Sequence, residues 1–166
     1  MKTIADKLAE LAIGEKNENT ADAFGRSAFN RYYYASYLIT RQMLKDLNTS
    51  WASTGHSKIP ELLENSIIKR IRTEIKNQNR AGLIPHNEAE KLKYISISAI
   101  CELTNVLRTA YSARVTADYD PEIRVVRDGH NMKLRDDTLD SAQKWVKRVS
   151  QFTKSLLKVW SHLGLS

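Results

Sequence analysis

The sequence predicts an all-α protein, an up-and-down bundle of four to five helices. Three observations predict it. Glycine (6) and proline (3) are scarce among the 166 residues, whereas a sheet protein needs turns every ~8–12 residues. Apolar residues recur at helical spacing over long stretches. The connections between these stretches are mostly short and polar, which favours antiparallel neighbours.

Five helices are expected, each begun by a capping or turn residue, at 3–13, 20–46, 58–77, 87–114 and 136–162. Asn87 with Glu90 three residues later forms a capping-box pattern, and Asp136 or Asp137 caps the last helix. Residues 48–57 and 117–135 are expected to be loops. We therefore expect a single domain over 1–166, with an N-terminal helix and linker at 1–19 and the bundle core at 20–162.

Two of these helices have distinct faces. The first is expected to bury an apolar face made of Ile4, Leu8, Leu11 and Ala12. The last has an apolar stripe of Ala142, Val146, Val149, Leu156 and Trp160. Its opposite side carries the basic residues Lys144, Lys147, Arg148, Lys154 and Lys158. That basic row is interpreted either as a solvated face or as a surface that binds along a phosphate backbone.

Composition restricts the compartment and the partners. The net charge is +7, from 26 basic and 19 acidic residues, which permits contact with RNA, DNA or an acidic protein. Cys101 is the single cysteine, so no internal disulfide can form and a reducing compartment is expected. No apolar run approaches the ~20 residues that cross a bilayer, and the N-terminus lacks a signal-peptide pattern. We expect a cytoplasmic protein that does not contact a membrane.

The sequence lacks the motifs of several well-known kinds of metal, nucleotide and catalytic site. There is no cysteine–histidine cluster for zinc, no glycine-rich phosphate loop and no nucleophile elbow. No metal and no cofactor are therefore expected.

The informative residues are charges on apolar faces. On the fourth helix Arg114 falls about 40° from Leu92, on the core-facing stripe. On the second helix Arg31 lies at the edge of the stripe formed by Ala28, Tyr32, Ala35 and Ile39. Asn30, Tyr33 and Tyr37, with Arg26 and Arg41, share a separate polar and aromatic side. A buried guanidinium needs a partner, and Asp118 is the obvious one for Arg114.

Two interpretations of these residues stay open. In the first, Arg31, Arg114, Asp118 and Tyr119 form a buried polar lock that joins the second and fourth helices. In the second, the same residues line a small cleft and carry out phosphodiester or nucleotide chemistry.

Three motifs in order resemble the HEPN superfamily, whose name stands for higher eukaryotes and prokaryotes nucleotide-binding. Residues 31–35 (RYYYA) resemble its R-x-Y-Y-A signature. Residues 55–57 (GHS) resemble the HS that opens the following helix in one prokaryotic branch. Residues 114–119 (RVTADY) resemble that branch's R-x-x-A-D-Y element. The resemblance covers about residues 20 to 160.

The resemblance implies a helical bundle that commonly forms a homodimer. Many HEPN proteins are metal-independent ribonucleases of toxin–antitoxin, anti-phage or CRISPR-linked systems, with an active-site arginine followed after four to six residues by a histidine. Arg114 corresponds to this arginine, but Ala117, Asp118 and Tyr119 stand where the histidine is expected. A carboxylate is a poorer general acid at neutral pH. The pairs Arg80 with His86 and Arg124 with His130 have suitable spacing but lie in expected connectors, so chance explains them.

His56 is the best histidine candidate, because the resemblance places it beside the arginine helix. Its alternative role is that of a helix-start residue satisfied by the backbone.

The expected function is that of an RNA-associated HEPN effector in a prokaryotic defence or toxin–antitoxin system, with metal-independent endoribonuclease activity as one form of it. Arg114 and Arg31 would then stabilise a phosphate, and Tyr119, Asp118 or His56 would transfer a proton. The alternative is a non-catalytic HEPN module that binds a nucleotide, an RNA or a partner protein such as a nucleotidyltransferase. A third class, a structural assembly subunit, would need an exposed patch, which Tyr33, Tyr37 and Trp51 could supply.

Overall fold

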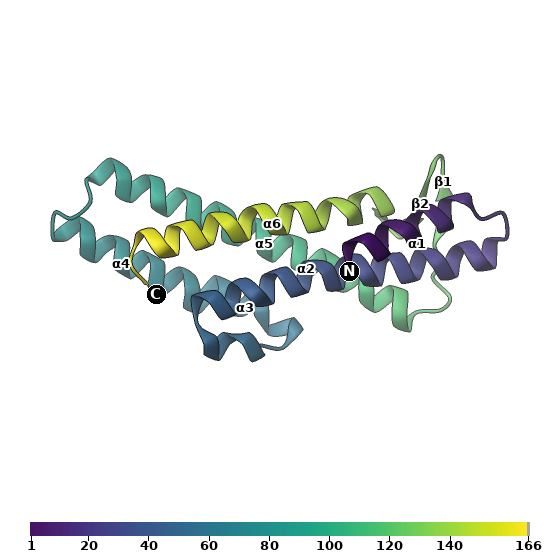
Figure 1. The fold of residues 1–166 in the computed structure, drawn as a ribbon, viewed down its shortest axis with the longest axis horizontal. Coiled ribbons are helices and arrows are strands. Elements are labelled where there is room, and N and C mark those ends of the chain that lie inside the picture. The colour runs from purple at the N-terminus through teal and green to yellow at the C-terminus, as the bar shows by residue number, and fades with distance from the viewer. Residues whose placement is uncertain (166) are drawn as a thin grey trace. The chain divides into compact units, whose positions relative to one another are not determined.

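The computed structural model describes residues 1–165 and consists mainly of helices (Figure 1). The α-helices are α1 (Lys2–Gly14), α2 (Glu18–Leu47), α3 (Ile59–Leu62), α4 (Ile68–Arg80), α5 (His86–Tyr119) and α6 (Leu139–His162). Three short segments accompany them: the 3-10 turns η1 (Thr49–Ser53) and η2 (His56–Lys58), and the π-helical η3 (Leu63–Ile67). The prediction of an all-α helical bundle is confirmed.

Helix α5 begins and ends at residues other than those expected. Its end is Tyr119, so Ala117, Asp118 and Tyr119 are helical, not part of a loop. At its start the carbonyl of Pro85 accepts from the N–H groups of Glu88 and Ala89, at 3.1 and 3.0 Å. Asn87 therefore lies inside the first turn, and the expected capping box with Glu90 is wrong.

Helix α6 is capped by Thr138, not by Asp136 or Asp137. The Ser141 N–H donates to Thr138 Oγ1 at 3.1 Å, and the Thr138 N–H donates to Ser141 Oγ at 3.0 Å. This reciprocal pair is the bonding pattern of a capping box, with serine in the place of the usual Glu or Gln.

A small antiparallel sheet precedes α6; its first two strands lie within the expected loop, and its third strand lies where the last helix was expected to begin. Its strands β1 (Val126–Asp128), β2 (Asn131–Leu134) and β3 (Asp137–Thr138) pair in chain order. Its turns use Gly129 (φ 61°) and Arg135 (φ 53°). Strands of two to four residues are too short to produce a recognisable alternation of apolar and polar residues, which is why the sequence did not predict them.

Close contacts divide the chain into two compact units. The first unit comprises Met1–Leu38 with Val106–Arg148, and the second comprises Ile39–Asn105 with the chain from Val149 onward. Helices α2, α5 and α6 each contribute residues to both. The expected single domain over 1–166 stays a prediction.

In the first unit α1 packs through small side chains. Ala5, Ala9 and Ala12 are buried, whereas Ile4 and Leu11 are 54% and 50% exposed. The predicted apolar face of this helix is therefore wrong except for Ala12 and the half-buried Leu8. Alanines at positions i, i+4 and i+7 lie on one face, and their short side chains allow a neighbouring element to approach closely.

Polar side chains fix α1 to its neighbours within this unit. Asp6 accepts a hydrogen bond from the Tyr32 hydroxyl at 2.9 Å and one from Gln143 Nε2 at 3.1 Å. Burial and the nearby Asp6 carboxylate both raise the pKa of Tyr32, so its hydroxyl stays protonated and remains a donor.

In the second unit a row of apolar residues runs through α3, η3 and α4 at a spacing of four. All five of its members are buried: Ile59, Leu63, Ile67, Ile71 and Ile75. Four residues advance about 400° on an α-helix, so such a row drifts about 40° per step. The π-helical turn holds more residues per turn, and it therefore returns part of the drift and keeps the row on the core side.

Trp51 and Trp160 also belong to the second unit, where their rings make an edge contact with centroids 5.9 Å apart. Trp51 is half-buried, and Tyr33 and Tyr37 of the first unit are buried. The exposed aromatic patch that an assembly subunit would need is therefore not formed by these residues.

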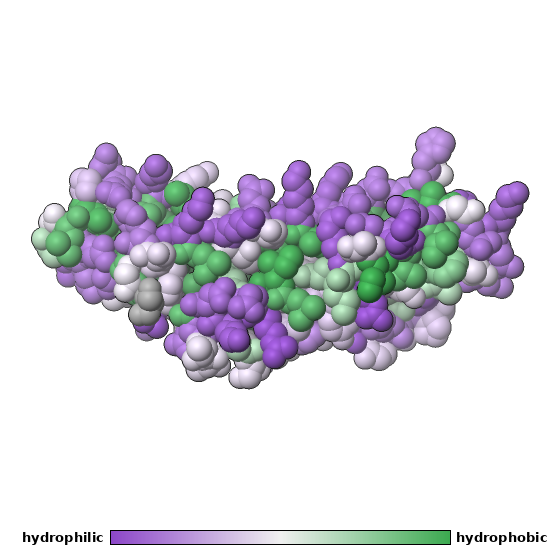
Figure 2. All heavy atoms as spheres, viewed as in Figure 1, coloured by the Kyte–Doolittle hydropathy of each residue, from purple (hydrophilic) through white to green (hydrophobic). Residues whose placement is uncertain are grey.

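The predicted apolar stripe of α6 is buried, and all five basic residues of its other side are exposed. Hydrophilic side chains project along this helix in Figure 2. Across residues 1–165, no helix combines the length and the apolar character needed to span a membrane.

Candidate RNA-contact site

Arg114 lies near the end of α5 in the first unit, and its side chain is 18% exposed. Its Nε lies 2.8 Å from Asp118 Oδ2, one helical turn later. The Nε–H does not point at this oxygen, so the contact is an ion pair without a hydrogen bond. Asp118 is thus the partner of Arg114, as the sequence predicted.

Tyr119 holds the other side of the same guanidinium. Arg114 Nη2 donates to Tyr119 Oη at 3.3 Å, and the guanidinium carbon lies 5.0 Å from the centroid of the tyrosine ring. Burial acts to lower the pKa of Arg114, but the hydrogen bond with Tyr119 and the charge of Asp118 raise it further than burial lowers it. The guanidinium is therefore firmly charged.

Asn30 links this pair to α2. Its Nδ2 lies 2.9 Å from both carboxylate oxygens of Asp118. The sequence placed Asn30 on the polar and aromatic side of the second helix, but it did not identify this residue as the group that contacts Asp118.

Arg31 is exposed, so the prediction that it points inward is wrong. The buried positions of α2 from Ala28 to Thr40 cover an arc of about 200°. The sequence interpretation used a narrow stripe centred near Ala28, whereas the buried arc is centred about 80° further round, near Ser36. Arg31 then falls on the opposite side, and it is not part of the polar lock.

A group of tyrosines in the first unit includes Tyr33 and Tyr34, which interact electrostatically with Arg114. The ring of Tyr33 lies 5.4 Å from Tyr34, 6.3 Å from Tyr37 and 5.9 Å from Tyr111, between centroids. Burial raises the pKa of Tyr33, and the neighbouring tyrosines add to this, although Arg114 opposes it. Tyr111 is partly exposed and Tyr119 is 65% exposed.

We name six of these residues the Arg114 cluster: Asn30, Tyr33, Tyr111, Arg114, Asp118 and Tyr119. The cluster holds one charged guanidinium against the exposed ring of Tyr119. It contains no histidine, and the one histidine of the first unit, His130, lies in the turn between β1 and β2. His56 belongs to the second unit, where it begins η2 and is half-buried.

Arg26 has a structural role that the sequence analysis missed. Its guanidinium donates to the carbonyls of Ala117 at 2.8 Å and of Asp120 and Pro121 at 3.1 Å, and also to Ile123. Its Nε lies 3.0 Å from Asp22 Oδ1. The last carbonyls of a helix have no partner within that helix, so Arg26 caps α5 just beyond Arg114. The only signal in the sequence was that Arg26 shares a helix side with Asn30.

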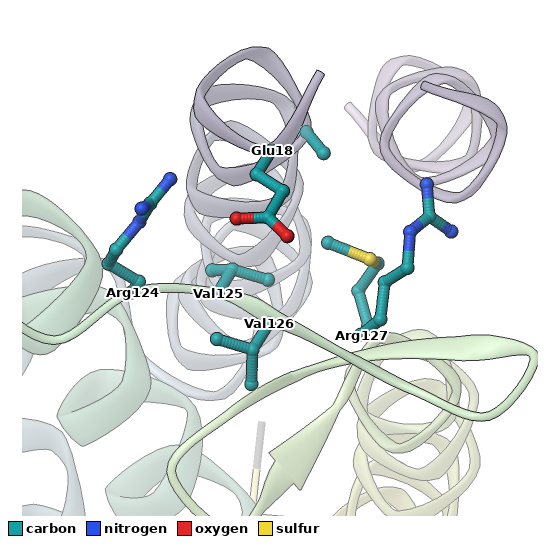
Figure 3. A pocket seen from close by; sticks show the side chains of 7 residues that line it. Glu18, Arg124, Val125, Val126 and Arg127 are labelled. Atoms are coloured by element: carbon teal, nitrogen blue, oxygen red, sulfur yellow. The ribbon is translucent and has the colours of Figure 1, made fainter. Parts of the chain in front are cut away.

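A separate cavity of about 130 Å³ lies between the start of α2 and β1 and β2 of the same unit. Figure 3 shows Glu18 reaching toward Val125 and Val126, with Arg124 and Arg127 on either side. Both arginines donate hydrogen bonds within the protein. Arg124 donates to Asn19, and Arg127 donates to the carbonyls of Ile13 and Glu15. Because ligand pockets usually measure about 300–1,000 Å³, this cavity is too small for a nucleotide.

Among the described residues no group of three or more histidine, cysteine, aspartate or glutamate side chains could hold a metal ion. Comparisons with models of protein families, with curated proteins and with solved structures find no match. The resemblance to HEPN proteins therefore rests on the three motifs alone and stays a prediction.

Proposed function

We propose that this protein is a HEPN-type, RNA-associated effector of a prokaryotic defence or toxin–antitoxin system, and that the Arg114 cluster contacts RNA. One observation carries the proposal. The charged guanidinium of Arg114 is held 5.0 Å from the centroid of the exposed Tyr119 ring, three residues after the partly exposed Tyr111 on the same helix.

This arrangement matches the two chemical needs of RNA binding. Arginine is suited to phosphate because its planar fork can donate two parallel hydrogen bonds. Unstacked bases pack on tyrosine rings. A phosphate that approaches Arg114 would compete with Asp118, and the 2.9 Å contacts from Asn30 would still satisfy that carboxylate.

A second candidate is endoribonuclease activity, which the 3.3 Å contact between Arg114 Nη2 and Tyr119 Oη favours. Asp118 would accept the proton of the RNA 2′-hydroxyl, whose oxygen would attack the adjacent phosphorus to form a 2′,3′-cyclic phosphate while the bond to the 5′ oxygen breaks. Arg114 would stabilise the charge that develops on the phosphate. Tyr119 would donate its proton to the leaving oxygen.

The absence of histidine from the cluster favours binding over cleavage, because general acids work best with a pKa near the operating pH. It also favours the non-catalytic role in which the protein regulates a partner such as a nucleotidyltransferase. A homodimer and such a partner remain implications of the HEPN resemblance.

The test is to express the full chain alone and to measure growth, cellular RNA integrity and RNA co-purification. Arg114→Ala and Arg114→Lys are compared with the control Arg31→Ala, because the wild-type Arg31 side chain is exposed. We expect co-purified RNA that both Arg114 variants lose and Arg31→Ala keeps, since lysine cannot reproduce the bidentate contact.

Three outcomes separate the candidates. Growth arrest with intact RNA, relieved by Arg114→Ala, supports the binding effector. Cleaved RNA that is restored by both Arg114→Ala and Tyr119→Phe establishes a ribonuclease. Normal growth with intact RNA and no co-purified RNA contradicts the proposal and leaves the partner-binding module.

A further inference from the structure

A basic groove of about 300 Å³ lies in the second unit, between α4 and the first turns of α5. Figure 1 shows these two helices running side by side from the short turn that joins them. The groove has an apolar floor of Ile75 and Ala89, and its walls carry Arg72, Lys76, Asn79, His86, Glu90 and Lys93. We propose that this groove binds the phosphate backbone of single-stranded RNA. The inference rests on the proposed association with RNA but concerns a site in the other unit.

Helix α4 carries a large excess of basic over acidic side chains. Its 13 residues include five basic side chains, Lys69, Arg70, Arg72, Lys76 and Arg80, against the single acid Glu74. Arg72 and Lys76 are exposed, one turn apart, and in residues 1–165 neither has an ion-pair or hydrogen-bond partner. Like charges at this spacing destabilise a helix, and an anion bound in the groove would relieve the repulsion.

The basic residues of α4 also form a track. Lys69, Arg72, Lys76 and Arg80 fall within an arc of about 80° and extend over about 16 Å of helix. A polynucleotide follows such a row because each cation neutralises one phosphate and releases a condensed counterion. On the facing helix, Lys93 Nζ lies 3.6 Å from Glu90 Oε1, so this carboxylate offsets part of the positive charge of Lys93.

An exposed aromatic ring identifies the nucleic acid as single-stranded. Tyr94 follows Lys93 on α5 and is 74% exposed. It lies four residues after Glu90 of the groove wall, so the two side chains are neighbours on the helix surface. Grooves that bind single strands combine a positive track with rings on which bases stack. A duplex would keep its bases stacked inside and would not use such a ring.

The test measures binding of a fluorescent 12-nucleotide oligouridine to the full chain at several salt concentrations. Lys76→Glu is compared with Lys45→Glu, an equal charge change at an exposed residue in the last turn of α2 that does not line the groove. We expect Lys76→Glu to raise Kd at least about tenfold and to reduce the salt slope by about 0.7, the loss of one phosphate contact. The Kd of Lys45→Glu is expected to stay within about threefold of that of the wild type. Circular dichroism confirms that each variant is folded.

A second variant tests the single-stranded assignment. Tyr94→Ala should weaken oligouridine binding about tenfold and leave the binding of inorganic polyphosphate, which has no bases, unchanged. Equal losses for oligouridine and polyphosphate would overturn this assignment. Equal effects of Lys76→Glu and Lys45→Glu on Kd would overturn the groove itself.

The effects of Arg114→Ala and Lys76→Glu on RNA binding distinguish a failure of the groove from a failure of the Arg114 cluster. If Arg114→Ala abolishes binding and Lys76→Glu does not, the groove is wrong and the proposed RNA contact stands. The reverse result rejects the Arg114 cluster and supports the groove.

Discussion

Arg26 and Arg31 lie five positions apart on α2 and have opposite environments. The Arg26 side chain is 16% exposed and donates to the carbonyls beyond the end of α5. Arg31 is exposed and has no ion-pair or hydrogen-bond partner within residues 1–165. Five residues advance about 500° on a helix, so the two side chains leave α2 in directions about 140° apart.

These environments predict different effects on stability. Arg26→Ala removes the donor to the carbonyls at and beyond the end of α5 and one of the donors to Asp22, and it should lower the free energy of unfolding by about 2–4 kcal/mol. Arg31→Ala should change it by less than about 0.5 kcal/mol. Urea denaturation followed by circular dichroism measures both. Similar losses for the two variants would show that Arg26 does not hold the end of α5.

The sequence predicted part of the candidate site. It paired Arg114 with Asp118 because a guanidinium on a core-facing stripe requires a carboxylate, and the structure confirms this pair. It missed Asn30 because a polar residue outside the apolar stripe gives no sign that its face is also buried. The width of the buried arc of α2 depends on which elements pack around it, and that information is not local to the helix.

At the scale of elements, the long helices could be predicted and the segment between α5 and α6 could not. Helical periodicity is strong over 20 or more residues and weak over the short strands of the β1–β3 sheet. The sequence also predicted that α5 ends too early, at residue 114, because residues 117–119 lie beside turn-forming residues. The position of Thr138 as the cap of α6 depended on that sheet.

Gly25 of α2 tests how closely this segment packs on the helix. A Cβ atom at Gly25 would lie 2.6 Å from Val125 Cγ1, and the Val125 N–H is fixed by Asp22 Oδ1 at 2.7 Å. Alanine normally favours a helix over glycine by about 1 kcal/mol, but overpacking costs about 1–3 kcal/mol.

We therefore expect Gly25→Ala to lower the melting temperature, and Val125→Ala in the same chain to recover part of the loss. Gly14→Ala is the control, because nothing lies within 4 Å of the position that a Cβ atom would take there. A melting temperature that rises in Gly25→Ala as much as in Gly14→Ala would contradict this packing.

At the scale of the whole molecule, the charge of +7 is distributed over surfaces with different roles. The basic side of α6 is exposed, as the sequence predicted. Arg114 and the α4–α5 groove place further cations beside exposed tyrosines, one site in each unit. No sequence pattern indicated the groove, because its walls come from two helices whose facing sides only the packing determines.

The central claim is that the Arg114 cluster contacts RNA. Fluorescence anisotropy of a labelled oligoribonucleotide, titrated with the wild-type chain, Arg114→Ala and Arg31→Ala, tests it most directly. We predict that Arg114→Ala weakens binding at least about tenfold, since a bidentate contact of a charged guanidinium is lost, while Arg31→Ala changes it less than about threefold. Equal affinities of all three folded proteins would contradict the claim.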